Sequence, residues 1–338
     1  MKRRSLLPTT IDPNLAHLAY GQYAIIKLNR GLQSSDLIER IKSVNSLSEY
    51  LHDPEHITLA ITEQVPITLQ NCLLDKDKII RIKACECLKI ISSHPIGRKS
   101  FEKFDIMRSI LKAFDDEEEN VRLHAHASIE LISQSPLIQK LIMNDSLIPI
   151  LVNKLKQETL QDIISIILQS LNKCYKYDPD QGLDAGALDI IIELIQSKND
   201  DIAAKSLENL TALCITLRGK NSSTDPEIIK ILVGLLKHGF VDVRCYAASS
   251  LMMIAMTTPG KYAIIAQKGI ENLLILLKDD LDEIKTYALK GLTCLCEAPK
   301  ARKTLISHLE KFQALKESSN ETVAKAANIA IKTIIWKP

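Results

Sequence analysis

The sequence predicts an all-α fold, a right-handed superhelical solenoid of about eight units, from three observations. A nine-residue pattern recurs along the chain: apolar, basic, two variable positions, small, three variable positions, apolar. Its copies follow one another at intervals of 39 to 42 residues, a spacing typical of stacked helical repeats. Hydrophobic residues make up 46% of the 338 residues and aromatic residues only 4%, so we expect an aliphatic core. Because stacked repeats bury a continuous core between neighbours, one long domain is expected rather than several globular ones.

The nine-residue pattern marks the long helix of each unit. It begins at Glu39, Ile80, Val121, Ile163, Ile202, Val243, Ile284 and Val323. The small position holds Ser43, Ala84, Ala125, Ser206, Ala247, Ala288 and Ala327, and only Ile167 breaks the rule. The closing apolar position holds Leu47, Leu88, Ile129, Leu171, Leu210, Leu251, Leu292 and Ile331. Positions four apart share a helix face, so the small residue lets a neighbouring helix approach closely while the larger one fills the space above it.

Two further recurrences predict the other helices of a unit. Amphipathic segments with apolar residues at three- and four-residue steps precede the long helices at residues 148–156, 188–196, 228–237 and 270–278. Glycine and proline recur between units at residues 95–99, 217–220 and 258–261, with a weaker copy at 298–303. We expect these residues to end the long helix and to start a short one. A short helix between two longer ones is the armadillo form; the alternative, a HEAT solenoid, has two helices per unit.

The chain is expected to divide into an extended N-terminal arm, residues 1–23, and an armadillo-repeat solenoid, residues 24–338. Pro8, Pro13 and Asn14 are poor residues for a helix interior, whereas the helical pattern begins near Ala24. The arm is predicted to be dispensable for folding and to order on contact with a partner. No apolar segment follows the basic start Met1-Lys2-Arg3-Arg4, and no run of 18 apolar residues occurs, so neither a secretory signal nor a membrane span is expected.

Net charge and cysteine content further limit the kinds of ligand and site that the protein can have. The 43 basic and 41 acidic residues leave a net charge of +2, which argues against binding nucleic acid through bulk charge. The eight cysteines are expected to be reduced thiols that pack as small core residues. Cys85 and Cys87, like Cys294 and Cys296, would point about 200° apart on a helix, which disfavours a shared metal ion.

No catalytic, cofactor-binding or metal-binding residue is assigned. His52 and His56 stand four apart, but Pro54 interrupts the helix that a metal pair would need, so we expect a solvated turn. His124 and His126 are expected to diverge on one helix. Gly219-Lys220 and Gly260-Lys261 lack the strand and the earlier glycine of a phosphate-binding loop. The sequence therefore predicts a protein that is not an enzyme, with no cofactor and no small-molecule ligand.

Charged residues at the helix starts have two interpretations. The basic position of the pattern holds Arg40, Arg81, Arg122, Arg244 and Lys285, which we expect to bond to the preceding unit's carbonyls or to an acidic turn. The alternative is a basic ladder that binds a ligand. The acidic run from Asp115 to Glu119 is expected to be a solvated turn, with Asn120 as the helix cap, and alternatively to dock a basic partner.

One known binding mode is disfavoured. Armadillo proteins similar to importin-alpha hold an extended peptide with asparagines two residues after the closing position. Here those positions hold Glu49, Ile90, Leu131, Lys173, Ala212, Met253, Cys294 and Thr333. A nuclear-localisation-signal mechanism is therefore not expected.

Several short segments carry a resemblance to one family. They are Ile11-Asp12-Pro13, Ala19-Tyr20-Gly21, Leu51-His52-Asp53-Pro54-Glu55-His56, Gly260-Lys261-Tyr262-Ala263, Phe312-Gln313-Ala314-Leu315 and the terminal Trp336-Lys337-Pro338. Over residues 10–338 the chain resembles the armadillo-repeat family called radial spoke head 14 homolog, also known as rhabdoid tumour deletion region protein 1. Residues 157–180 are the least similar part.

The resemblance implies a structural, non-enzymatic subunit of the radial spokes of motile cilia and flagella. It implies other radial spoke proteins as partners in a large complex, and a place in the cytoplasm, the cytoskeleton and the axoneme of the cilium. Nucleic acid and membranes are not expected as partners. The alternative function is a soluble armadillo or HEAT adaptor that carries cargo for transport or assembly. Neither interpretation assigns protein-binding residues.

Overall fold

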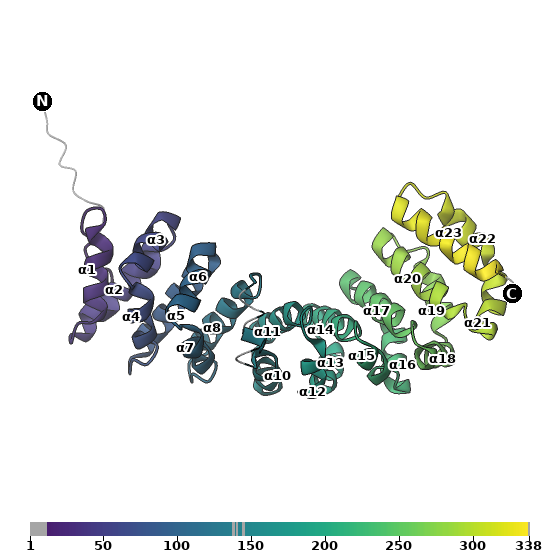
Figure 1. The fold of residues 1–338 in the computed structure, drawn as a ribbon, viewed down its shortest axis with the longest axis horizontal. Helices are drawn as coiled ribbons and strands as arrows, with labels where there is room; N and C mark the ends of the chain where they lie inside the picture. Colours follow the sequence, from purple (N-terminus) through teal and green to yellow (C-terminus); the bar gives the residue numbers. More distant parts are fainter. Residues whose placement is uncertain (1–11, 137–138, 140, 144–145, 337–338) are drawn as a thin grey trace, which may run out of the picture. The chain divides into compact units, whose positions relative to one another are not determined.

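The computed structural model describes residues 12–136, 139, 141–143 and 146–336, and the chain divides into two compact units (Figure 1). The N-terminal unit is Met1–Asn144 and the C-terminal unit is Asp145–Pro338. The described residues form helices and connecting turns without a strand, so the predicted all-α class is confirmed. None of their helices combines the length and the apolar character that crossing a membrane requires.

Among its described residues, the N-terminal unit has three long helices with shorter ones between them. In chain order, the helices are α1 (Tyr23–Leu32), α2 (Leu37–Tyr50), α3 (Pro54–Thr62), α4 (Val65–Cys72), α5 (Lys78–Ser93), α6 (Pro95–Lys103), α7 (Met107–Ala113) and α8 (Glu119–Ile132). The long helices α2, α5 and α8 pack in series, each on the next. Each repeat joins a short, a middle and a long helix, as in α3, α4 and α5.

The C-terminal unit continues the same order. Its helices are α10 (Leu147–Gln157), α11 (Gln161–Cys174), α12 (Pro179–Asp184), α13 (Ala187–Ile195), α14 (Asp200–Leu213), α15 (Leu217–Ser222), α16 (Pro226–Leu235), α17 (Val241–Ile254), α18 (Thr258–Ala266), α19 (Gly269–Leu276), α20 (Asp282–Leu295), α21 (Pro299–Ile306), α22 (Leu309–Lys316) and α23 (Glu321–Ile335). The long helices α11, α14, α17, α20 and α23 pack in series. The four predicted middle segments correspond to α10, α13, α16 and α19, within one or two residues at each end.

The repeat pattern has the packing role that the sequence predicts. Every residue at the small position, Ile167 included, is at most 3% exposed. The closing position is fully buried from Leu47 to Leu292, whereas Ile331 in α23 is half-buried. Side-chain caps start many of the helices: Asp36, Asp77 and Asn199 accept hydrogen bonds from the first free N–H groups of α2, α5 and α14.

The recurrent glycines have a different role from the one predicted. Gly97, Gly219 and Gly260 do not end the long helix; they lie inside the first turn of α6, α15 and α18. A Cβ atom added to them would lie 1.7, 1.9 and 2.1 Å from the carbonyl oxygens of Ile91, Leu213 and Ile254 in the preceding long helix. Only glycine permits this close approach of two backbones. The prolines behave as predicted, because Pro95 and Pro299 open α6 and α21.

The described part of the arm is partly bound to the first helices. The Ala16 N–H donates to Ser46 Oγ at 2.8 Å, and Lys27 Nζ donates to the His17 carbonyl at 2.8 Å. Asn45 of α2 also donates to the Asn14 carbonyl. Residues 14–17 therefore lie against α1 and α2, while residues 1–11 are outside the described part of the chain. That the arm is dispensable for folding stays a prediction.

Replacing the buried small residue of α20 tests the packing assignment. Ala288→Leu should lower the free energy of unfolding by about 1–3 kcal/mol, because three extra carbon atoms must enter a filled helix junction. Ala314→Leu is the matched control, since Ala314 is exposed on α22 of the same unit. Chemical denaturation measures both variants. Equal stability of the two would show that the register of the long helices is wrong.

A second pair of variants tests the backbone contact at the joint of the repeats. Gly260→Ala should cost about 1–3 kcal/mol of stability, because its Cβ would overlap the Ile254 carbonyl. Gly234→Ala in α16 has no heavy atom within 4 Å of the new Cβ and should stabilise the protein by about 0.5–1 kcal/mol through helix propensity. Melting temperatures that move in the same direction in both variants would contradict the close approach.

Candidate protein-binding surface

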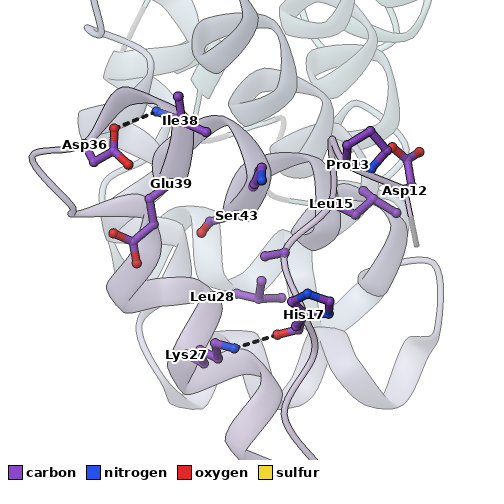
Figure 2. A pocket seen from close by; sticks show the side chains of 12 residues that line it. Asp12, Pro13, Leu15, His17, Lys27, Leu28, Asp36, Ile38, Glu39 and Ser43 are labelled. Atoms are coloured by element: carbon purple, nitrogen blue, oxygen red, sulfur yellow. Dashed lines mark hydrogen bonds between the residues drawn. The ribbon is translucent and has the colours of Figure 1, made fainter. Parts of the chain in front are cut away.

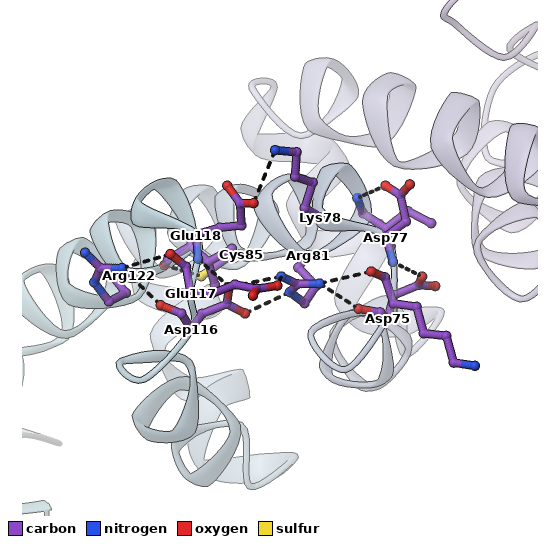
Figure 3. A network of polar contacts seen from close by, with 12 residues as sticks. Asp75, Asp77, Lys78, Arg81, Cys85, Asp116, Glu117, Glu118 and Arg122 are labelled. Atoms are coloured by element: carbon purple, nitrogen blue, oxygen red, sulfur yellow. Dashed lines mark hydrogen bonds and ion pairs between the residues drawn. The ribbon is translucent and has the colours of Figure 1, made fainter.

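Three arginines at the basic position, Arg40, Arg81 and Arg244, bond to the following repeat. Figure 3 shows Arg81 between two turns: Nη1 donates to the carbonyls of Asp75 and Lys76 at 3.1 and 3.2 Å. On the other side Nε and Nη2 donate to the Asp116 carboxylate at 2.8 and 3.2 Å. Both side chains are nearly buried, with 10% and 12% exposed. The fork of the guanidinium therefore fixes the distance between the starts of α5 and α8.

The same contact recurs, with a direction that differs from the prediction. Arg40 pairs with Asp75 at 3.1 Å and Arg244 with Asp279 at 3.0 Å, in each case a carboxylate of the following unit rather than the preceding one. The carbonyls that accept from each arginine belong to the turn before its own helix. Arg122 follows this rule with the Asp116 and Glu117 carbonyls. Lys285 is the exception, since it bonds within its own helix to Asp282.

The acidic run near residue 116 belongs to this network and is not a solvated turn throughout. Asp116 is nearly buried against Arg81, and its Oδ1 also accepts the Glu118 N–H at 2.9 Å. Asn120 is not the helix cap, because α8 begins at Glu119 with Glu118 at the cap position. The side-chain bond at this turn is therefore made by Asp116, four residues before Asn120.

The solvated turn expected for His52 and His56 is correct for His52 and wrong for His56, which is packed into the fold. His56 lies in α3, stacks on Tyr50 with ring centroids 3.6 Å apart and bonds to the Tyr50 carbonyl, whereas His52 is exposed in the turn. His126 is buried against Phe114, and burial lowers the pKa of the partly exposed His124 to about 4. Burial raises the pKa of all eight thiols, to about 11 in Cys72 and about 12 in Cys174, which keeps them protonated. The described residues contain no group of three potential ligands placed to hold a metal ion.

A pocket of about 350 Å³ lies where the arm meets α1 and α2 (Figure 2). Asp12, Pro13 and Leu15 of the arm form one wall, and Asp36 and Glu39 of α2 lie opposite. The charged groups of the lining are of both signs, and the Asp36 carboxylate is already occupied as the cap of α2. This lining offers no nucleophile with a base beside it.

The long helices of the C-terminal unit lie side by side and expose one face (Figure 1). We call it the long-helix face; on α14, α17 and α20 it carries Glu208, Asp242, Tyr246, Glu283 and Tyr287. Asp242 and Glu283 are exposed, and the other three are half-buried. The Tyr287 hydroxyl donates to Glu283 at 3.0 Å. Burial first, and then negative charges that include Glu208, Asp242 and Glu283, raise the pKa of Tyr246 to about 12.

The positions that importin-like proteins give to asparagine lie on the long helices without an asparagine. Ile90 and Ala212 are buried there, Met253 and Cys294 are half-buried, and Glu49 is exposed. The nearby Asn209 is fully buried and donates to the Leu168 and Lys205 carbonyls, so it joins α14 to α11. A peptide would meet carboxylates and phenols on this face instead of an amide ladder.

The sequence analysis did not identify the long-helix face as a site. A signal was present, because Tyr246 and Tyr287 are 41 residues apart, as are Asp242 and Glu283. Charged and aromatic residues at the repeat period indicate a surface that successive repeats present together. Half-exposed tyrosines beside carboxylates can hydrogen-bond and pack against a polypeptide, but they form no catalytic set.

Comparison with known proteins supports the helical-repeat architecture. Residues 144–336 match the family described as Armadillo-like, and this segment coincides with the C-terminal unit. The crystal structure of an engineered protein from the Northeast Structural Genomics Consortium is similar, with a TM-score of 0.85 and 20% sequence identity. The match covers 94% of this chain and 79% of that one, which at this identity is evidence of fold alone.

Removing an arginine tests the contact between repeats. Arg81→Ala should lower stability by about 2–3 kcal/mol, because the nearly buried Asp116 carboxylate and two turn carbonyls lose their donor. Arg81→Lys should recover only part of this loss, since an ammonium cannot span both turns as the fork does. Lys325→Ala, which removes an exposed pair with Glu321, should change stability by less than about 0.5 kcal/mol. Urea unfolding that ranks the three otherwise would refute a structural role for Arg81.

Proposed function

Because the chain belongs to the Armadillo-like family, we propose that it is a non-enzymatic scaffold subunit of the radial spoke in the axoneme of motile cilia and flagella. Armadillo repeats are protein-binding scaffolds, which supports the general part of this proposal. The segments that resemble radial spoke head 14 homolog, such as Leu51 to His56, support the cellular part. Other radial spoke proteins would be its partners, and the cytoskeleton of the cilium its location.

The long-helix face is the observation that carries the proposal. Tyr246 and Tyr287 combine a rigid apolar ring with a hydroxyl, which is the chemistry enriched at the centres of protein interfaces. Asp242 and Glu283 stand exposed beside them and favour a partner with basic side chains. A scaffold of this kind binds through many shallow contacts over a wide area rather than through a deep pocket.

Localisation of the tagged protein in ciliated cells tests the cellular part. We expect the tag along the axoneme and in detergent-extracted axonemes, cross-linked to radial spoke proteins. A diffuse tag that is absent from extracted axonemes, together with binding to basic localisation peptides, would favour the transport adaptor instead.

Charge reversal on two faces tests the surface. Asp242→Lys with Glu283→Lys should reduce recovery in the axonemal fraction at least about tenfold, because it opposes a basic partner. Asp189→Lys with Glu227→Lys is the matched control: these exposed acids also lie in first helical turns, but on the middle helices α13 and α16. Equal recovery of the two double variants would remove the long-helix face from the proposal.

A further inference from the structure

A second surface of the C-terminal unit carries lysines. A pocket of about 660 Å³ is lined by three successive repeats, from the end of α16 through the end of α19 to Lys311 of α22. This volume is within the range of ligand pockets in proteins. Apart from Arg244 of α17, the lining residues come from the middle helices and from the turns that follow them, and none of them is a residue of the long-helix face.

Unpaired cations line this pocket. The ammonium groups of Lys237, Lys278 and Lys311 make no hydrogen bond or ion pair within the described part of the chain. Lys237 and Lys278 are exposed at equivalent places, 41 residues apart, and Lys311 is half-buried. The only carboxylate of the lining, Asp279, is 8% exposed and already paired with Arg244. The free charge of the pocket is therefore positive, although the whole chain is close to neutral.

The lining also has apolar residues. Ile275 is 56% exposed, an unusual state for an isoleucine, and Leu274 beside it is buried. A ligand that satisfied the lysines alone would leave this surface in water. A ligand with a carboxylate on each side of an apolar side chain would satisfy both.

We propose that this pocket binds a short acidic segment of a partner protein, with carboxylates on Lys237, Lys278 and Lys311 and an apolar side chain on Ile275. Nucleic acid fits less well, because its phosphates would meet Ile275, and the sole arginine of the lining is held by Asp279. The inference does not depend on the long-helix face or on the cilium.

Peptide binding tests the proposal directly. The probe is a fluorescein-labelled eight-residue peptide, Asp-Glu-Asp-Ile-Leu-Glu-Asp-Glu, titrated with the full chain and followed by fluorescence anisotropy. We expect saturable binding that weakens as salt rises, and at least about tenfold weaker binding when Asn and Gln replace the acids. Replacement of the central Ile-Leu by Ser-Ser should also weaken binding several-fold.

Variants of the protein locate the site. Lys237→Glu with Lys278→Glu should weaken binding at least about tenfold. The matched control is Lys303→Glu with Lys332→Glu, which changes exposed lysines of α21 and α23 and alters the net charge by the same amount. This control should leave the affinity within about twofold of the unchanged protein. Lys237→Gln with Lys278→Gln repeats the test with a milder change, and circular dichroism melts check that every variant is folded. Equal losses in the two Glu pairs would show attraction by bulk charge and overturn the proposal. Absence of saturation, or tighter binding of an oligonucleotide of equal charge through the same lysines, would overturn it as well.

Discussion

The close approach of successive long helices is the constraint on which the rest of the structure depends. Ala84, Ala125, Ala247 and Ala288 are fully buried where one long helix crosses the next. A larger side chain at these positions would hold neighbouring repeats apart. The glycines of the short helices act in the same way on the other side of the joint, where Gly260 lies against the Ile254 carbonyl. Small residues thus set the spacing of the repeats, and the aliphatic residues between them supply the buried area.

Close packing sets the distance between repeats. Apolar contacts have no fixed direction, so they oppose the sliding of one long helix along the next only weakly. The arginine contacts supply directional bonds against such sliding. Arg81 binds two carbonyls in the turn before its own helix and a carboxylate in the next repeat, so a shift of α8 by one helical residue would break the bonds to Asp116. Arg40, Arg81 and Arg244 each donate from Nε and Nη1 to the turns of the protein itself. The bonding between repeats that the sequence predicts for the basic position is therefore present at these three arginines.

Sequence periodicity predicted those features of the fold that depend on the type of a single residue at a given position of the repeat. The buried small residues, the middle helices and the use of cysteines as core residues follow from size and spacing, and the structure confirms them, with Cys294 as the one cysteine that is only half-buried. It did not predict the direction of the arginine contacts, since Asp116 is close to Arg122 in sequence but pairs with Arg81, 35 residues away. It also failed at Gly97 and Asn120, where the outcome depends on how two segments meet in space. The long-helix face was missed because none of its residues is unusual when taken alone. Only the repetition of acidic and tyrosine residues after 41 positions distinguishes them from other surface residues.

The C-terminal unit, in a chain of near-neutral net charge, has exposed carboxylates on its long helices and unpaired lysines beside its middle helices. On α17 and α20, Asp242 and Glu283 stand exposed beside tyrosines, whereas Lys237 and Lys278 stand unpaired at the ends of α16 and α19. A charge of +2 over the whole chain argues against bulk attraction to a polyanion, but it does not show whether acidic and basic side chains gather on different surfaces. Helical repeats favour such segregation, because a residue that recurs every 41 positions always returns to the same side. A protein built in this way can contact a basic partner on its long helices and an acidic one at its turns, with neither contact competing for the other's side chains.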